Sequence, residues 1–152
     1  MLESKLERRL IGEILIERRL VTLAQLDHAI EAQKTTHSGS YIGEILISLG
    51  YVSEIDIVTA LVLQCHLPYI SVSQHQIDPQ VKALIPSQVA WKNRLIPLDR
   101  IGNILSVVML NPLNEHVRQE VERLTKCQIA TFISTKSEIE TVLKRLYGEE
   151  ER

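Results

Sequence analysis

The chain has 152 residues, of which 45% are hydrophobic and 4% aromatic, and its formal net charge at pH 7 is −2. This length and apolar content are enough for one domain, or two very small ones, with a buried core. The weak charge and the few aromatic rings argue against nucleic acid as a partner, because they supply neither a cationic field nor stacking platforms. Cys65 and Cys127 lie far apart without C-x-x-C spacing, which indicates reduced core residues rather than a disulfide framework or a zinc ribbon.

No apolar stretch approaches the roughly 20 residues that a membrane-spanning helix needs. The charged start at residues 1–9 also lacks the apolar segment of a signal peptide. We therefore expect a cytoplasmic protein. Between Lys34 and Lys82 there is no Lys or Arg, so an anion bound there would depend on backbone N–H groups, histidines or a cation from elsewhere.

The first half contains an internal repeat. The six letters IGEILI occur at residues 11–16 and again at residues 42–47. At the same offset, from position 12 to position 43, further residues match without a gap: Val21 and Val52, Thr22 and Ser53, Leu26 and Ile57, Ala29 and Ala60, Ile30 and Leu61, Gln33 and Gln64. Such repetition predicts a duplicated structural unit.

Each copy predicts a helical hairpin, in which a short helix carrying IGEILI is followed by a tight turn, a hydroxyl N-cap and a second helix. The turns are expected near Arg19 and Gly50, the caps at Thr22 and Ser53, and the helix ends near Gln33 and Gln64. Leu23, Leu26, Ile30 and Gln33 recur at helical spacing and predict one apolar face. One hairpin cannot bury that face alone, so the two copies should pack as a four-helix unit with approximate twofold symmetry.

Two repeated residue pairs leave alternatives open. Gly12 and Gly43 cost helix stability, and their repetition indicates a close approach to the backbone, either by another helix or by a ligand. Gln33 and Gln64 are either solvated helix-end residues or a matched pair that reads the two edges of a symmetric ligand.

The helical repeat does not continue into the second half of the chain. The tripeptide His66-Leu67-Pro68 predicts a boundary, because Pro disfavours helix in the residue before it. We expect a helical subdomain over residues 1–66, a small α/β subdomain over 67–148 and a tail or linker over 149–152. The predicted elements are extended chain at Ile70 and Val72, helices opened by Asp78-Pro79 and Pro86-Ser87, strands at 95–98 and 104–110 joined through Gly102-Asn103, a helix at 113–125, a strand at 128–134, and a last helix with a Thr135–Glu138 capping box that stops at Gly148. The fold class is α+β, with two repeated αα-hairpins followed by a roughly three-stranded sheet covered by helices.

Catalytic motifs are absent from the sequence. It contains no G-x-x-x-x-G-K-[ST], no G-x-S-x-G and no H-E-x-x-H. The neighbours Cys65 and His66 point about 100° apart on a helix and cannot hold one metal without other ligands. We expect no enzyme activity, no metal and no cofactor, since a hydrolase or metal enzyme would require titratable groups clustered in a cleft.

The repeat resembles the tandem motif R-L-G-x-x-L-x-x-x-G, followed by L-x-x-x-L-x-x-Q, of the N-terminal domains of type II secretion and type IV pilus assembly ATPases. The second half is similar too, in the stretches 95–98 (LIPL), 102–103 (GN), 107–109 (VVM), 111–112 (NP) and 146–148 (LYG). These matches cover nearly the whole chain in the right order. The resemblance implies a module that docks a motor to inner-membrane platform proteins, cytoplasmic and peripheral to the membrane through these partners.

Some members of that family bind cyclic di-GMP, a twofold symmetric dinucleotide that suits a duplicated site. By this resemblance the candidate surface comprises Arg9, Leu10, Ile11, Gly12, Leu15 and Gln33 in copy one, and Tyr41, Ile42, Gly43, Leu46 and Gln64 in copy two. The motif arginines are replaced by Leu10 and Tyr41, and Arg19 replaces the later glycine of copy one. One lost charge-assisted contact costs about 1.5–3 kcal/mol, so docking is the first expectation and cyclic di-GMP binding the second.

Overall fold

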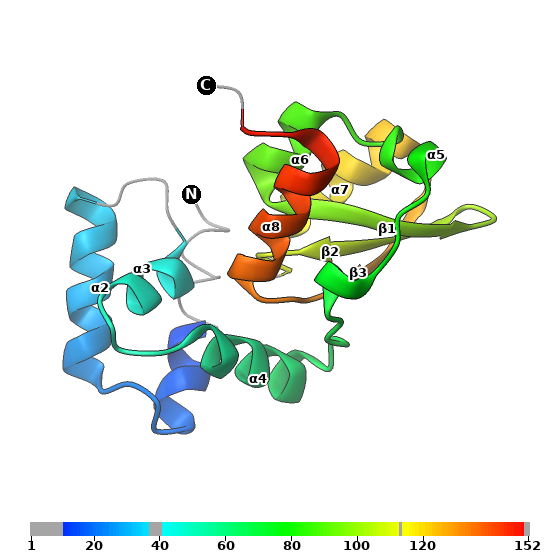
Figure 1. Cartoon of the computed structure of the whole chain (residues 1–152). Coiled ribbons are helices and arrows are strands. Elements are labelled where there is room, and N and C mark those ends of the chain that lie inside the picture. The colour runs from blue at the N-terminus through cyan, green and yellow to red at the C-terminus, as the bar shows by residue number, and fades with distance from the viewer. Residues whose placement is uncertain (1–10, 37–40, 113, 151–152) are drawn as a thin grey trace. The chain divides into compact units, whose positions relative to one another are not determined.

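The computed structural model describes residues 11–36, 41–112 and 114–150, without the side chains of Gln64 and Cys65. The chain divides into two compact units, which we call the helical unit (residues 1–66) and the sheet unit (residues 67–152) (Figure 1). The α+β class is confirmed.

The helical unit repeats one local design. Residues 11–17 are helical and are followed by α2 (Leu23–Thr35), α3 (Ile42–Ser48) and α4 (Glu54–Cys65). Thr22 accepts a hydrogen bond from the Gln25 N–H, and Ser53 accepts one from the Asp56 N–H, each as part of a capping box. The predicted hydroxyl caps of both second helices are therefore confirmed.

The predicted turns are confirmed as well, and both have the same geometry. Arg19 and Gly50 have positive φ angles of 60° and 79°. Across each turn the N–H of the following residue donates to a carbonyl five residues back, from Leu20 to Leu15 at 2.9 Å and from Tyr51 to Leu46 at 3.0 Å. This is the Schellman ending, in which a left-handed residue lets the chain satisfy the last carbonyls of a helix.

One side chain of the predicted apolar face lies elsewhere. Leu26 and Ala29 are buried, but Leu23 is 65% exposed. Leu23 is the first residue of α2, and its side chain lies beyond the part of the helix that the neighbouring elements cover. Helical spacing predicts which side chains share a face of α2, but not how far along the helix the neighbouring elements bury that face.

The sheet unit contains η1 (Val72–Gln74), α5 (Pro79–Lys82), α6 (Ser87–Asn93), β1 (Leu95–Ile101), β2 (Ile104–Met109), α7 (Glu115–Thr125), β3 (Gln128–Phe132) and α8 (Lys136–Tyr147). The strand order is β1-β2-β3. β1 and β2 form the predicted antiparallel hairpin, with a register shift between Pro97 and Asp99. β2 and β3 are parallel and are connected through α7.

The core of the sheet unit lies on both faces of the sheet. Leu95 and Ile96, which are consecutive in β1, are both fully buried, as are Val107 and Val108 in β2. Because consecutive strand residues point to opposite faces, each face must be covered. Helices α6 and α8 pack on β1, and α7 packs on β3, as Figure 1 shows.

The start of the sheet unit corrects a prediction. Val72 is not extended; it begins the short 3-10 helix η1. Only the chain just before it is strand-like, since Tyr69 forms a parallel bridge with Ile133. There the Ile133 N–H donates to Pro68 O at 2.9 Å, and the Ile70 N–H donates to Ile133 O at 3.0 Å.

Candidate functional site

Most apolar residues of the predicted dinucleotide surface belong to the core of the helical unit. Their exposed fractions are at most 7%, as the values for Ile11 (7%), Leu15 (0%), Ile42 (4%) and Leu46 (0%) show. These side chains hold the helices together, so their part in the repeated motif is structural. Arg9 and Leu10 lie outside the described residues, as does the side chain of Gln64.

The two repeated glycines have equivalent neighbours. A Cβ atom added at Gly12 would lie 2.7 Å from Cδ2 of Leu26, and one added at Gly43 would lie 3.8 Å from the Ile57 side chain. Leu26 and Ile57 occupy the same position of the two repeats. At Gly12 the space that a side chain would take is therefore filled by the second helix of the same hairpin, which favours the helix-packing interpretation there.

Among the described residues of the predicted surface, Gln33 and Tyr41 carry polar side chains, and both are half-buried. Gln33 lies in the last turn of α2. Tyr41 is the N-cap residue of α3, and its backbone N–H donates to the Glu44 carboxylate at 3.4 Å. An aromatic ring therefore stands at the start of α3, at the position of the motif's second arginine.

Contacts between the two copies join the hairpins. Helix α2 of the first copy packs on α3 of the second. Nδ1 of His28 lies 2.5 Å from the Tyr51 hydroxyl, and the two rings are tilted at 59° with centroids 5.8 Å apart. The duplicated hairpins thus pack on each other, as the repeat predicted.

A cluster that sequence reasoning missed surrounds Glu138 in the sheet unit. Its carboxylate accepts hydrogen bonds from five hydroxyl groups, those of Tyr69 (2.8 Å), Ser71 (2.6 Å), Ser73 (2.9 Å), Ser134 (3.2 Å) and Thr135 (3.4 Å). Of the predicted Thr135–Glu138 capping box, the N-cap hydrogen bond is present, since the Thr135 hydroxyl accepts from the Glu138 N–H at 3.2 Å. The carboxylate itself, however, fastens the segment that carries Tyr69, Ser71 and Ser73 to α8.

The electrostatics of Glu138 fit a structural role. Partial burial raises the pKa of its carboxyl, but the hydrogen bonds from Ser71, Tyr69, Ser73 and Ser134 outweigh that effect and lower the pKa from 4.5 to about 2. A carboxylate with so low a pKa is a weak proton acceptor at neutral pH. The hydrogen bond to Glu138 in turn raises the pKa of the Tyr69 hydroxyl.

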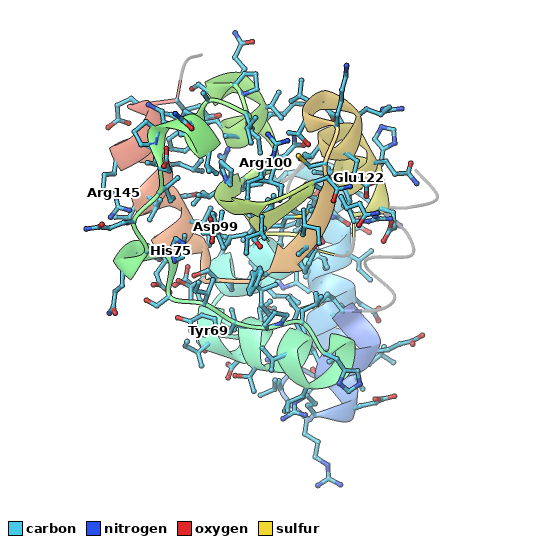
Figure 2. The ribbon with its side chains drawn as sticks, turned by 90° about the vertical axis from the view of Figure 1, so that its right-hand side faces the viewer. Tyr69, His75, Asp99, Arg100, Glu122 and Arg145 are labelled. Atoms are coloured by element: carbon cyan, nitrogen blue, oxygen red, sulfur yellow. The ribbon has the colours of Figure 1, made fainter. Side chains whose placement is uncertain are left out.

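Arg145 holds the same segment from a second point on α8. Its guanidinium donates to the backbone oxygens of Ser73, at 3.1 Å, and His75, at 3.2 Å. Figure 2 shows Arg145 beside the chain that carries His75. Sequence patterns do not reveal this cluster, because Ser71 and Ser73 lie more than 60 residues from Glu138 in the chain.

In the described part of the chain, no set of three or more His, Cys, Asp or Glu side chains is arranged to hold a metal. None of the helices described is both long and apolar enough to cross a membrane.

Tyr147 is a half-buried tyrosine that supports the fold. Burial raises the pKa of its hydroxyl to about 12, and the hydroxyl donates to the carbonyls of Lys82 and Ile85.

Comparison with protein families finds a match to the MshEN domain over residues 65–152. The type IV pilus assembly ATPase PilB of Myxococcus xanthus is 30% identical over 139 residues, which are 91% of this chain and 24% of the relative. PilB of Thermus thermophilus is 30% identical over 141 residues, which are 91% of this chain and 16% of the relative. The chain thus spans about a quarter, or about a sixth, of these curated relatives.

Two solved structures share the fold. The structure of MshE with cdg, cyclic di-GMP, has a TM-score of 0.73 and 28% identity, and the match covers 90% of this chain and 98% of that one. The N-terminal domain of XpsE has a TM-score of 0.77 at 22% identity, over 93% of this chain and 96% of that one. At 22% identity, the likeness to XpsE concerns the fold alone.

Proposed function

This chain belongs to the MshEN domain family, an N-terminal domain of pilus and secretion ATPases, and on that premise we propose that it is a non-catalytic docking module between the motor and an inner-membrane platform protein. One observation carries the proposal. Both units present large apolar side chains to solvent, namely Leu23 (65% exposed), Ile55 (58%), Leu63 (50%) and Ile101 (75%). Exposed apolar side chains mark protein-interaction sites where they lie together, as Ile55 and Leu63 do on one side of α4.

A capture experiment tests the docking function. The chain serves as bait for two purified proteins from its own genome, the motor portion of the ATPase and the cytoplasmic part of the platform protein. The matched control bait carries serine at Leu23, Ile55, Leu63 and Ile101, which are exposed enough for the fold to persist, and circular dichroism checks that it does. We expect the wild-type chain to retain both proteins and the control bait to retain at least about tenfold less, because anchor side chains dominate interface energies. Retention of neither protein by the wild-type chain would refute the docking role.

Cyclic di-GMP binding is the second candidate, because MshE, with which this chain shares its fold over 90% of its length, has been solved with that dinucleotide. A twofold symmetric ligand also suits two hairpins with matching caps and turns. Of the described candidate residues, Gln33, Tyr41 and Gly43 are the ones that are not buried. The cation deficit between Lys34 and Lys82 predicts weak binding.

Isothermal titration with a restored motif arginine tests this second function. Tyr41→Arg should tighten cyclic di-GMP binding by about tenfold or more, since one charge-assisted contact contributes about 1.5–3 kcal/mol. Ser48→Arg, at the exposed last residue of α3, adds the same charge elsewhere and should leave the affinity nearly unchanged. Absence of heat for both the wild type and Tyr41→Arg at about 100 µM ligand would remove the dinucleotide from consideration.

A further inference from the structure

Helix α4 is apolar on two sides. Val58, Ala60 and Leu61 face the core of the helical unit with exposed fractions of 9%, 0% and 4%, while Ile55 and Leu63 are 58% and 50% exposed. A helix on the surface of a globular protein needs only one apolar stripe. The second apolar side of α4 is therefore a feature of the surface rather than of the core.

The exposed residues form a row along the helix. Ile55, Thr59 and Leu63 are spaced by four residues, and Thr59 is exposed as well. We call these three residues the α4 ridge. It extends over about 12 Å of helix axis. Rows with this spacing pack into the groove between corresponding rows of another helix, at a crossing angle of about −50°. The α4 ridge therefore has the shape of one half of a helix–helix contact.

The charges around the ridge select the kind of partner. Glu54 and Asp56 lie in the first turn of α4, and no Lys or Arg occurs between Lys34 and Lys82. A second copy docked through the same ridge would place its Glu54 and Asp56 beside those of the first copy, and an anionic membrane would be repelled by these carboxylates in the same way. A partner with Lys or Arg beside its apolar stripe is attracted instead.

We propose that the α4 ridge is the docking site for an amphipathic helix of another protein, whose apolar stripe is bordered by Lys or Arg. The partner helix lays its stripe across Ile55, Thr59 and Leu63, and its basic residues face the carboxylates of Glu54 and Asp56. This proposal rests on the docking function, because it names the surface and the partner chemistry that docking would use.

The test compares a ridge variant with a matched control in the full chain. Ile55→Ser/Leu63→Ser removes the ridge, and Leu124→Ser removes a similarly exposed apolar side chain (45%) from the end of α7. Binding is measured first to the motor and platform proteins that the wild-type chain retains. It is measured next, by fluorescence anisotropy, to a helical peptide of about 18 residues with a leucine stripe bordered by lysine, and to its counterpart bordered by glutamate.

We expect the ridge variant to bind one of the two proteins, and the lysine peptide, at least about tenfold more weakly than the wild type, with Leu124→Ser unchanged. The glutamate peptide should bind at least about tenfold more weakly than the lysine peptide. Retention of both proteins by the ridge variant at wild-type affinity would overturn the proposal and leave the docking function standing. Binding of the lysine peptide alone would support the ridge and contradict the motor and platform partners. A dimer of the wild-type chain that the ridge variant dissociates would overturn the proposal in favour of a second copy.

Discussion

Alanine substitutions at Gly12 and Gly43 should change stability in opposite directions, although both glycines occupy the same repeat position. Replacing a glycine inside a helix by alanine stabilises it by about 0.5–1 kcal/mol. At Gly43 the new Cβ would lie 3.8 Å from Ile57, which is ordinary van der Waals contact. Gly43→Ala should therefore gain most of that amount.

At Gly12 the same substitution meets a filled space. The new Cβ would lie 2.7 Å from Cδ2 and 3.3 Å from Cδ1 of Leu26, a side chain that is only 8% exposed. Overpacking of this kind costs about 1–3 kcal/mol, which exceeds the gain in helix propensity. We expect Gly12→Ala to destabilise the chain by up to about 2 kcal/mol.

Urea titration followed by circular dichroism measures both free energies of unfolding. A double-mutant cycle with Leu26→Val, which removes the crowded Cδ atom, provides the control. In that background Gly12→Ala should lose most of its cost, because the coupling between touching residues is what the cycle isolates. If Gly12→Ala stabilises the chain as much as Gly43→Ala does, Leu26 does not pack on Gly12 and the helix-packing account of the repeated glycines is wrong.

Three further predictions concern local features. Arg19→Gly should raise the free energy of unfolding by about 1 kcal/mol, and Gly50→Ala should lower it by a similar amount. Both positions have positive φ, and only glycine adopts that conformation without a steric cost. Effects of the same sign in thermal unfolding would contradict this. Glu138 has a pKa of about 2 in the fold against 4.5 ordinarily, so its contribution to stability is complete above about pH 5 and is lost as the pH falls toward 2. The free energy of unfolding, measured across this range, should fall less steeply in Glu138→Gln than in the wild type or in the control Glu149→Gln. Parallel curves would refute the role of the hydroxyl cluster. Ser53→Ala should cost about 1 kcal/mol through loss of the α4 cap, with Ser53→Gly costing only a few tenths, and an unchanged melting temperature in Ser53→Ala would count against the cap.

The apolar residues of the repeated motif show why this chain resembles the family at these positions. Ile11, Leu15, Ile42 and Leu46 are buried, so agreement with the family at these positions reflects the packing of the hairpins. Ligand binding would depend on other positions, such as the arginine site occupied by Tyr41. The family model matches residues 65–152, so membership of the family does not depend on these buried residues of the helical unit.

The sequence alone determined the local architecture. Repetition of IGEILI, hydroxyl caps at Thr22 and Ser53, and turn positions at Arg19 and Gly50 predicted the hairpins correctly, because capping and turn hydrogen bonds join atoms no more than five residues apart. Such interactions depend on the identity of a few neighbouring residues, and these can be read directly.

Only the tertiary structure decided which side chains are covered and which distant groups meet. It placed Leu23 in solvent, closed Leu26 over Gly12, and brought Ser71 and Ser73 to Glu138, more than 60 residues away. The pattern of letters along a helix indicates which residues share a face, but not what lies opposite that face. Burial and long-range hydrogen bonds arise from the packing of whole elements, which no local window of sequence contains.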